Sequence, residues 1–193
     1  QVDFTSIQTG AHRKLSGLDK ALNHHRTTLD WIERCRQRGR RTLVVNFDEG
    51  RPEEDRHAWW SAYLAGGVWE AHVLEPYDRP MSAWKSVWTQ LGGTRAFMEL
   101  LRFWEMESHD EVVKAGKAFC LAKPGEVYAL YLPLGGSVTV SLPPNGRFEA
   151  AWWNPANGKD GRFQNRARVS GGLRQLTPPS DGDWALRILR NEE

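Results

Sequence analysis

Cysteine is scarce in this sequence, and the two residues present, Cys35 and Cys120, lie far apart. Such a pair is no disulfide framework, and no Cys/His spacing is typical of a zinc site. No apolar run is long enough to cross a membrane. Neither sign of charge dominates, because 26 Lys and Arg against 24 Asp and Glu leave a net charge of +2. That balance argues against nucleic acid as a partner.

What the chain has in excess is tryptophan, with ten residues in 193. Indole rings fill protein cores, and they also stack on sugar rings, so both uses stay open for individual tryptophans. The length fits one large domain or two small ones. The sequence begins at Gln1 without a signal-like segment, which suits a processed product or a piece of a longer protein.

The stretch Thr42–Gly50 organises the first half of the chain. Its apolar run, from Leu43 to Phe47, is typical of a buried parallel strand. Such strands carry their polar chemistry at the C-terminal end, where Asp48 and Glu49 stand. Glu49 is therefore the first candidate for a functional carboxylate. The alternative is that Asp48 and Glu49 only cap the next helix.

The residues on either side of this strand alternate between strand and helix patterns. Strands are predicted over 2–9, 42–47 and 68–73, and helices begin near Ser16, after Asp55 and at Ser82. The pair Gly92-Gly93 is expected to bend or break the last helix. We expect Phe4 and Ile7 to lie on an exposed sheet edge.

The run from Arg34 to Arg41 holds five arginines besides a cysteine, a glutamine and a glycine. One interpretation is a phosphate-binding patch. The other is the solvated end of a helix, where cations complement the helix dipole. The near-neutral net charge favours the second.

After Glu107 the sequence changes to short β-patterned runs at close spacing. They cover 117–122, 127–132, 137–142, 147–153, 162–169 and 184–189, and turn signals such as Pro143-Pro144-Asn145-Gly146 and Gly171-Gly172 separate them. This spacing predicts a small antiparallel β-sandwich. The domains predicted are 1–107 and 108–193. The fold class is thus α/β followed by all-β.

Three stretches together resemble a known family of bacterial proteins. They are Leu43–Gly50, Arg56–Gly67 and, most specific, Ala122–Pro133, with Trp153–Gly158 and Asp183-Trp184 in support. The family is that of glycoside-hydrolase-like TIM-barrel proteins with apiosidase-like barrels and a C-terminal β-sandwich, which in some members is described as collagen-binding. The likeness covers nearly the whole chain. It implies the last three βα units of a (β/α)8 barrel, followed by the sandwich.

The resemblance also implies roles for single residues. Glu49 would be the catalytic nucleophile, or the base in an inverting enzyme, with Asn46 and Asp48 orienting it. The sugar subsite would be lined by polar and aromatic residues at the strand ends, namely Gln8, His12, Trp69, Glu70 and His72. For Trp69, core packing remains the alternative. No metal or organic cofactor is needed, and the family's location would be secreted or periplasmic.

The barrel strand that carries the acid/base in this family would precede the present sequence. A carbohydrate substrate would then require a complementary N-terminal barrel segment or an oligomer partner. The competing hypothesis is a non-catalytic module that binds carbohydrate or matrix protein or serves assembly. Nucleic-acid binding through 34–41 is the third reading.

Overall fold

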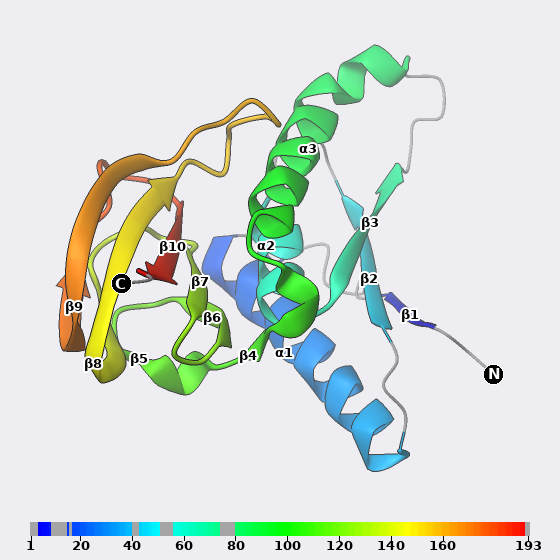
Figure 1. Cartoon of the computed structure of the whole chain (residues 1–193). Coiled ribbons are helices and arrows are strands. Elements are labelled where there is room, and N and C mark those ends of the chain that lie inside the picture. Colours follow the sequence, from blue (N-terminus) through cyan, green and yellow to red (C-terminus); the bar gives the residue numbers. More distant parts are fainter. Residues whose placement is uncertain are drawn as a thin grey trace. The chain divides into compact units, whose positions relative to one another are not determined.

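The computed structural model of the chain describes residues 4–8, 15, 17–39, 43–50, 56–73 and 80–191, with the backbone alone for 47–50, 71–73 and 81. The fold mixes helix and sheet, and the chain divides into two compact units, Gln1–Thr89 and Gln90–Glu193 (Figure 1). The sequence placed the domain boundary near residue 108, which is later in the chain. Helix α3, Lys85–Glu99, begins in the first unit and ends in the second.

The first unit is a three-stranded parallel sheet with helices in the connections. Its elements are β1 (Phe4–Gln8), α1 (Gly17–Gln37), β2 (Leu43–Gly50), α2 (Arg56–Leu64), β3 (Val68–Val73) and the short 3₁₀ helix η2 (Met81–Trp84). The strands lie in chain order, β1-β2-β3, and both pairings are parallel. The predicted strand–helix alternation is confirmed in this unit.

Helix α1 ends at Gln37, inside the basic run of residues 34–41. Asp19 stands in its first turn and Arg34 and Arg36 in its last, so the charges complement the helix dipole. The guanidinium of Arg34 lies 5.2 Å from the centre of the Trp31 ring, and Gly39 follows with a positive φ of 69°. In the described residues up to 39, this arrangement matches the helix-end interpretation of the run.

Helices α1 and α2 pack on the same face of the parallel sheet. His25 Nδ1 on α1 lies 3.0 Å from the carbonyl oxygen of Ser61 on α2. A Cβ at Gly67, just before β3, would lie 2.6 Å from Cγ2 of Thr28 on α1 and 2.9 Å from the Val44 carbonyl oxygen. The chain therefore needs glycine at position 67 to bring α1 against the sheet.

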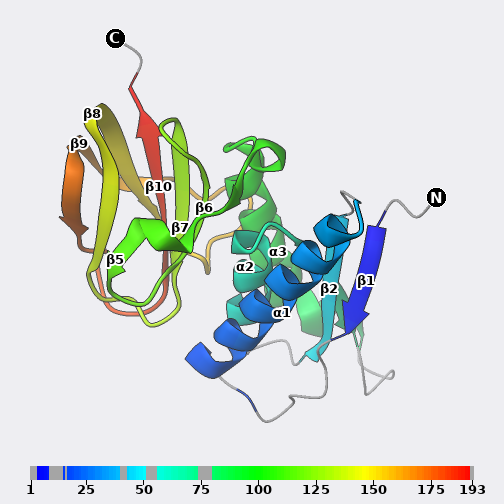
Figure 2. The same ribbon diagram turned by 90° about the horizontal axis from the view of Figure 1, so that it is seen from below.

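The second unit is built on one antiparallel sheet of seven strands. Its elements are η3 (Phe103–Glu105), β4 (Glu107–Ser108), η4 (Asp110–Val112), β5 (Val113–Ala115), β6 (Phe119–Lys123), β7 (Val127–Leu132), β8 (Val138–Trp153), β9 (Gln164–Leu176) and β10 (Trp184–Arg190). The order is β4-β6-β7-β10-β8-β5, and β9 pairs with β8. The sheet is strongly curled (Figures 1 and 2).

The hollow side of this sheet holds the hydrophobic core. Seven apolar residues of the predicted β runs are all buried in one cluster, namely Tyr128, Leu130, Leu132, Val138, Val140, Trp152 and Trp184. The rings of Trp152 and Trp184 meet edge to face at 6.3 Å, and those of Tyr128 and Phe148 at 6.1 Å. The prediction of an antiparallel all-β part is therefore confirmed.

Two turns predicted in this part are wrong. Residues 143–146 and Gly171-Gly172 lie inside β8 and β9, which pair with one another on both sides of a register shift between Leu142 and Arg147. A Cβ at Gly171 would lie 1.8 Å from the carbonyl oxygen of Pro143. The Pro-Pro-Asn-Gly segment is thus a bulge that closes over a glycine of the neighbouring strand.

The predicted break of α3 at Gly92-Gly93 is also wrong, because the helix continues to Glu99. A Cβ at Gly93 would lie 1.9 Å from the carbonyl oxygen of Asn157. One turn later, the Phe97 ring lies 5.9 Å from Trp153 and 5.7 Å from Phe163. Glycine serves here for close approach between the helix and the 154–161 segment.

Candidate functional site

Of the predicted site residues, Gln8 ends β1 and Glu49 is next to last in β2, whereas Asn46, Trp69 and Glu70 lie within their strands. Strand pairing puts Gln8 opposite Phe47 and Phe47 opposite Glu70, so these three Cα atoms form one row across the sheet. Since neighbouring strands are about 4.8 Å apart, the Cα atoms of Gln8 and Glu70 are about 10 Å from each other. The backbone of Glu49 is paired with that of His72, two residues further along.

Gln8 and Glu70 both face away from the helices. Thr5 Oγ1 lies 3.7 Å from Cys35 Sγ on α1, and the Trp69 ring meets His24 of α1, so these side chains mark the helix face. Side chains alternate along a strand, which puts Gln8 and Glu70 on the opposite face, where both are exposed.

This second face, the open face of the sheet, also carries apolar side chains in contact with water. Phe4 is 54% exposed and Leu43 is 45% exposed, whereas Ile7 is buried. As expected, β1, which carries both residues, is an end strand of the described sheet; the Phe4 side chain is exposed there, and the Ile7 side chain is buried. Parallel sheets are normally covered on both faces, so the open face is unusual for the type.

Asn46 lies in the layer between the sheet and α1. Its side chain is buried, and its Nδ2 donates to Thr28 Oγ1 at 2.9 Å and to the His24 carbonyl oxygen at 3.5 Å. Thr28 Oγ1 in turn donates to the same carbonyl at 2.7 Å. The geometry gives Asn46 a role in joining β2 to α1 and does not bring its amide to the open face.

Trp69 also belongs to the helix side. Its ring meets the ring of the buried His24 edge to face, with centroids 5.2 Å apart. This contact favours the core-packing alternative for Trp69 over a sugar platform.

Four further predicted site residues are His12, Asp48, Glu49 and His72. His12 lies outside the described residues, and for Asp48, Glu49 and His72 the described part is the backbone. Glu49 is the next-to-last residue of β2, which extends three residues past the predicted strand end at 47.

Two further features are absent from the part of the chain that the structure describes. No group of three or more His, Cys, Asp or Glu in this part of the chain is arranged to hold a metal ion. None of the helices described has both the length and the apolar character needed to cross a membrane.

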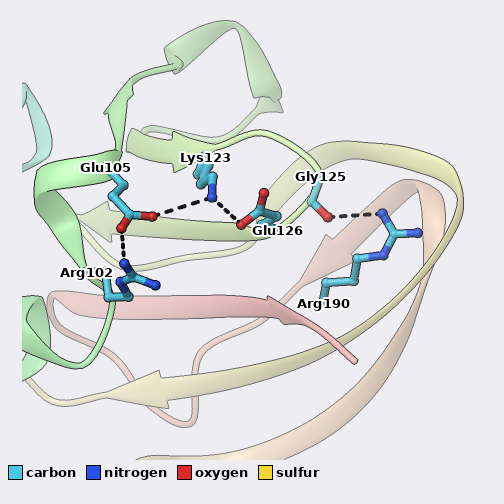
Figure 3. Close-up of polar contacts among 6 residues, drawn as sticks. All are labelled: Arg102, Glu105, Lys123, Gly125, Glu126 and Arg190. Carbon is cyan, nitrogen blue, oxygen red and sulfur yellow. Dashed lines mark hydrogen bonds and ion pairs between the residues drawn. The ribbon is translucent and has the colours of Figure 1, made fainter. Parts of the chain in front are cut away.

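The second unit holds charged groups that the sequence did not single out. Arg102 pairs with Glu105, Glu105 Oε2 lies 3.4 Å from Lys123 Nζ, and that nitrogen lies 2.6 Å from Glu126 Oε2 (Figure 3). The hydrogen bond to Glu126 raises the pKa of Lys123. These groups lie on the surface, where such pairs contribute little to stability.

A more buried charge cluster surrounds Glu149 on β8. Its Oε1 accepts from Arg166 Nη1 at 2.9 Å and from Arg187 Nη2 at 3.0 Å. The Arg187 guanidinium stands 4.1 Å from the centre of the Phe163 ring, and burial lowers its pKa, which the Glu149 charge opposes. No sequence motif signals this cluster, since its members come from three strands and a loop.

Comparisons with known protein families and with curated proteins do not identify a relative of this chain. No protein-family model matches the sequence, and no curated protein matches it.

The role of Asn46 in the fold gives a first prediction. Asn46→Ala leaves Thr28 Oγ1 without its buried donor, so we expect a loss of about 1–3 kcal/mol in unfolding free energy. Urea unfolding measures it, with Thr28→Val as the matched variant that removes the other partner. The double variant should lose less than the sum of the two, and strict additivity would contradict the contact.

Proposed function

We propose that this chain is the C-terminal segment of a glycoside hydrolase of the barrel type, with Glu49 as its nucleophile or base. The observation that carries the proposal is the order of the first unit. Three parallel strands follow one another in chain order, and α1 and α2 cover the same face. Right-handed connections that progress in one direction put their helices on one face, and in a (β/α)8 barrel this progression continues around the whole sheet. In a doubly wound sheet it reverses at a switch point, and the three described strands contain no reversal.

The open face supports the same assignment. In a barrel the face away from the helices is the packed interior, which further strands close. A complementary barrel segment, which is the partner we propose, would cover the exposed Phe4 and Leu43 side chains on that face. The later β unit corresponds to the C-terminal β-sandwich of the family that the sequence resembles.

The chemistry follows from where the carboxylates stand. In a retaining glycosidase one carboxylate attacks the anomeric carbon while an acid protonates the departing oxygen, and water then cleaves the glycosyl ester. The resemblance puts that acid on a strand that precedes this sequence, and Glu49 at the C-terminal edge takes the attacking role. We propose that Gln8 and Glu70 contact the sugar, which their common row on the open face supports.

The test is reconstitution with the polypeptide encoded upstream of this sequence in the native gene. We expect the chain alone to be inactive and the assembly to cleave aryl glycosides. Glu49→Gln should abolish cleavage with the melting temperature unchanged, because it removes the charge and keeps the shape.

Glu70→Gln is the matched control, since Glu70 is an exposed carboxylate on the neighbouring strand two register positions away. If Glu70 only contacts the sugar, this substitution should raise KM more than it lowers kcat. Full activity of Glu49→Gln, or loss confined to Glu70→Gln, would remove Glu49 from the nucleophile's role. An assembly without any glycosidase activity would favour the binding module.

A further inference from the structure

Strand β9 is the outermost strand of the seven-stranded sheet, as Figures 1 and 2 both show. It spans 13 residues, and within the described chain its one neighbour is β8. The strands at the other ends of the sheet, β4 and β5, have 2 and 3 residues. Short end strands offer few free backbone groups, but a long one is a template for a further strand.

The side chains of β9 are exposed over most of its length. The five residues from Gln164 to Arg168 are all exposed, and Leu173 is 62% exposed further along. Val169 is buried in the core, which fixes the register of the strand against β8. The strand is thus held firmly on one side and open along the other.

The charge on this strand has one sign. β9 contains Arg166, Arg168 and Arg174 and no Asp or Glu. Arg174 is bound to Ser170 of its own strand, with Nη2 donating to Oγ at 2.6 Å. At the other end, Arg168 is the register partner of Glu149, the carboxylate that already accepts from Arg166 and Arg187. Two guanidinium groups therefore bind this carboxylate, and a third arginine, Arg168, stands at its register position.

We propose that the outer edge of β9 binds an extended acidic peptide, which joins the sheet as an added strand. Backbone N–H and C=O groups along the edge supply the hydrogen bonds, as in other cases of strand addition. Carboxylates at alternate positions of the peptide meet the cation excess around Arg166 and Arg168. The same arginines oppose pairing with a second copy of β9, because like charges would face each other.

The binding test uses the full chain and labelled 12-residue peptides in fluorescence anisotropy. One peptide alternates Glu with Val, and its partner alternates Lys with Val. We expect the acidic peptide to bind at least about tenfold more tightly than the basic one at low salt, since two arginine charges favour it. Equal affinities, or no binding of the acidic peptide, would overturn the proposal.

Two N-methylated acidic peptides separate strand addition from attraction by charge alone. One carries methyl groups on its odd-numbered amides and the other on its even-numbered amides. In an added strand, alternate amides point toward β9, so one of the two peptides should lose binding and the other should keep it. If both bind like the parent, the peptide does not pair with the edge and the proposal fails.

Charge reversal then locates the site. The double variant Arg166→Glu, Arg168→Glu should prefer the basic peptide, while Arg95→Glu, at an exposed side chain of α3, should leave the preference unchanged. A circular-dichroism melt checks that the double variant is folded, and the methylated peptides test the unaltered chain in any case. If the chain sediments as a dimer and the acidic peptide does not dissociate it, the edge pairs with a second copy and the proposal is wrong.

Discussion

Replacing Trp152 with alanine should lower the unfolding free energy of the β unit by about 3–5 kcal/mol, the usual loss when a buried tryptophan is truncated. Trp152 is buried in the core cluster, and its ring meets Trp184 edge to face. The strands on either side, β9 and β10, hold its backbone in place. The cavity left by the indole therefore cannot close by a small shift of β8.

Trp104→Ala provides the matched control, since the same truncation is made at a residue that is 63% exposed. Its loss should stay below about 1 kcal/mol, as for most surface substitutions. Guanidinium unfolding of the full chain, followed by far-ultraviolet circular dichroism, gives both values. Similar losses at the two positions would place Trp152 outside the core and reopen a sugar-stacking role for it.

A second large effect is expected on raising the pH. Burial raises the pKa of the Cys120 thiol far above its ordinary value, and the nearby charge of Asp110 adds to this. Asp110 Oδ1 also accepts a hydrogen bond from the Cys120 backbone N–H at 2.8 Å, so the carboxylate is held beside the thiol. In the folded protein the thiol therefore stays neutral in alkaline solution.

The sign of the effect on stability follows from the proton count. Above pH of about 8.5 the unfolded chain loses the thiol proton and the folded chain keeps it, so stability falls by about 1.4 kcal/mol per pH unit from this group. Between pH 8.5 and 10.5 the loss is about 2.3 kcal/mol, because the full slope is reached only about one pH unit above the unfolded pKa. Urea unfolding across this range measures it, and Cys120→Ala should remove that part of the slope. An unchanged slope in Cys120→Ala would contradict the buried thiol.

The sequence predicted those elements whose apolar pattern is complete within the element. The run Val127–Leu132 is β7 with both bounds correct, and the helix predicted to begin near Ser16 is α1, Gly17–Gln37. In both cases local propensity and burial point to the same structure. The local sequence alone is sufficient to specify elements of this kind.

The errors fall where a distant segment decides the local structure. Pro143–Gly146 and Gly171-Gly172 have the composition of turns. Because β8 pairs with β9, the first segment forms a bulge in β8 and the second lies in β9 directly beside it. Gly93 looks like a helix breaker, but the carbonyl of Asn157 requires it. A glycine in the sequence can indicate a turn or a close approach by another segment. The sequence does not identify which segment approaches it.

For the candidate site, the sequence predicted the edge of the sheet and left the face of each side chain open. An unbroken apolar run such as Leu43–Phe47 does not reveal which residues point toward the helices. The contacts of Asn46 with Thr28 and of Trp69 with His24 settle that point for two residues. Gln8 and Glu70 remain on the open face, with Glu49 following on the neighbouring strand.

The position of β10 sets the order in which the β unit can be made. It lies between β7 and β8 and pairs with both, although all other strands of the sheet precede it in the chain. During synthesis, the facing edges of β7 and β8 therefore stay unpaired until residues 184–190 have left the ribosome. Nascent chains stalled before Trp184 should be recognised by chaperones that bind extended apolar strands, and chains stalled well beyond Arg190 should escape them.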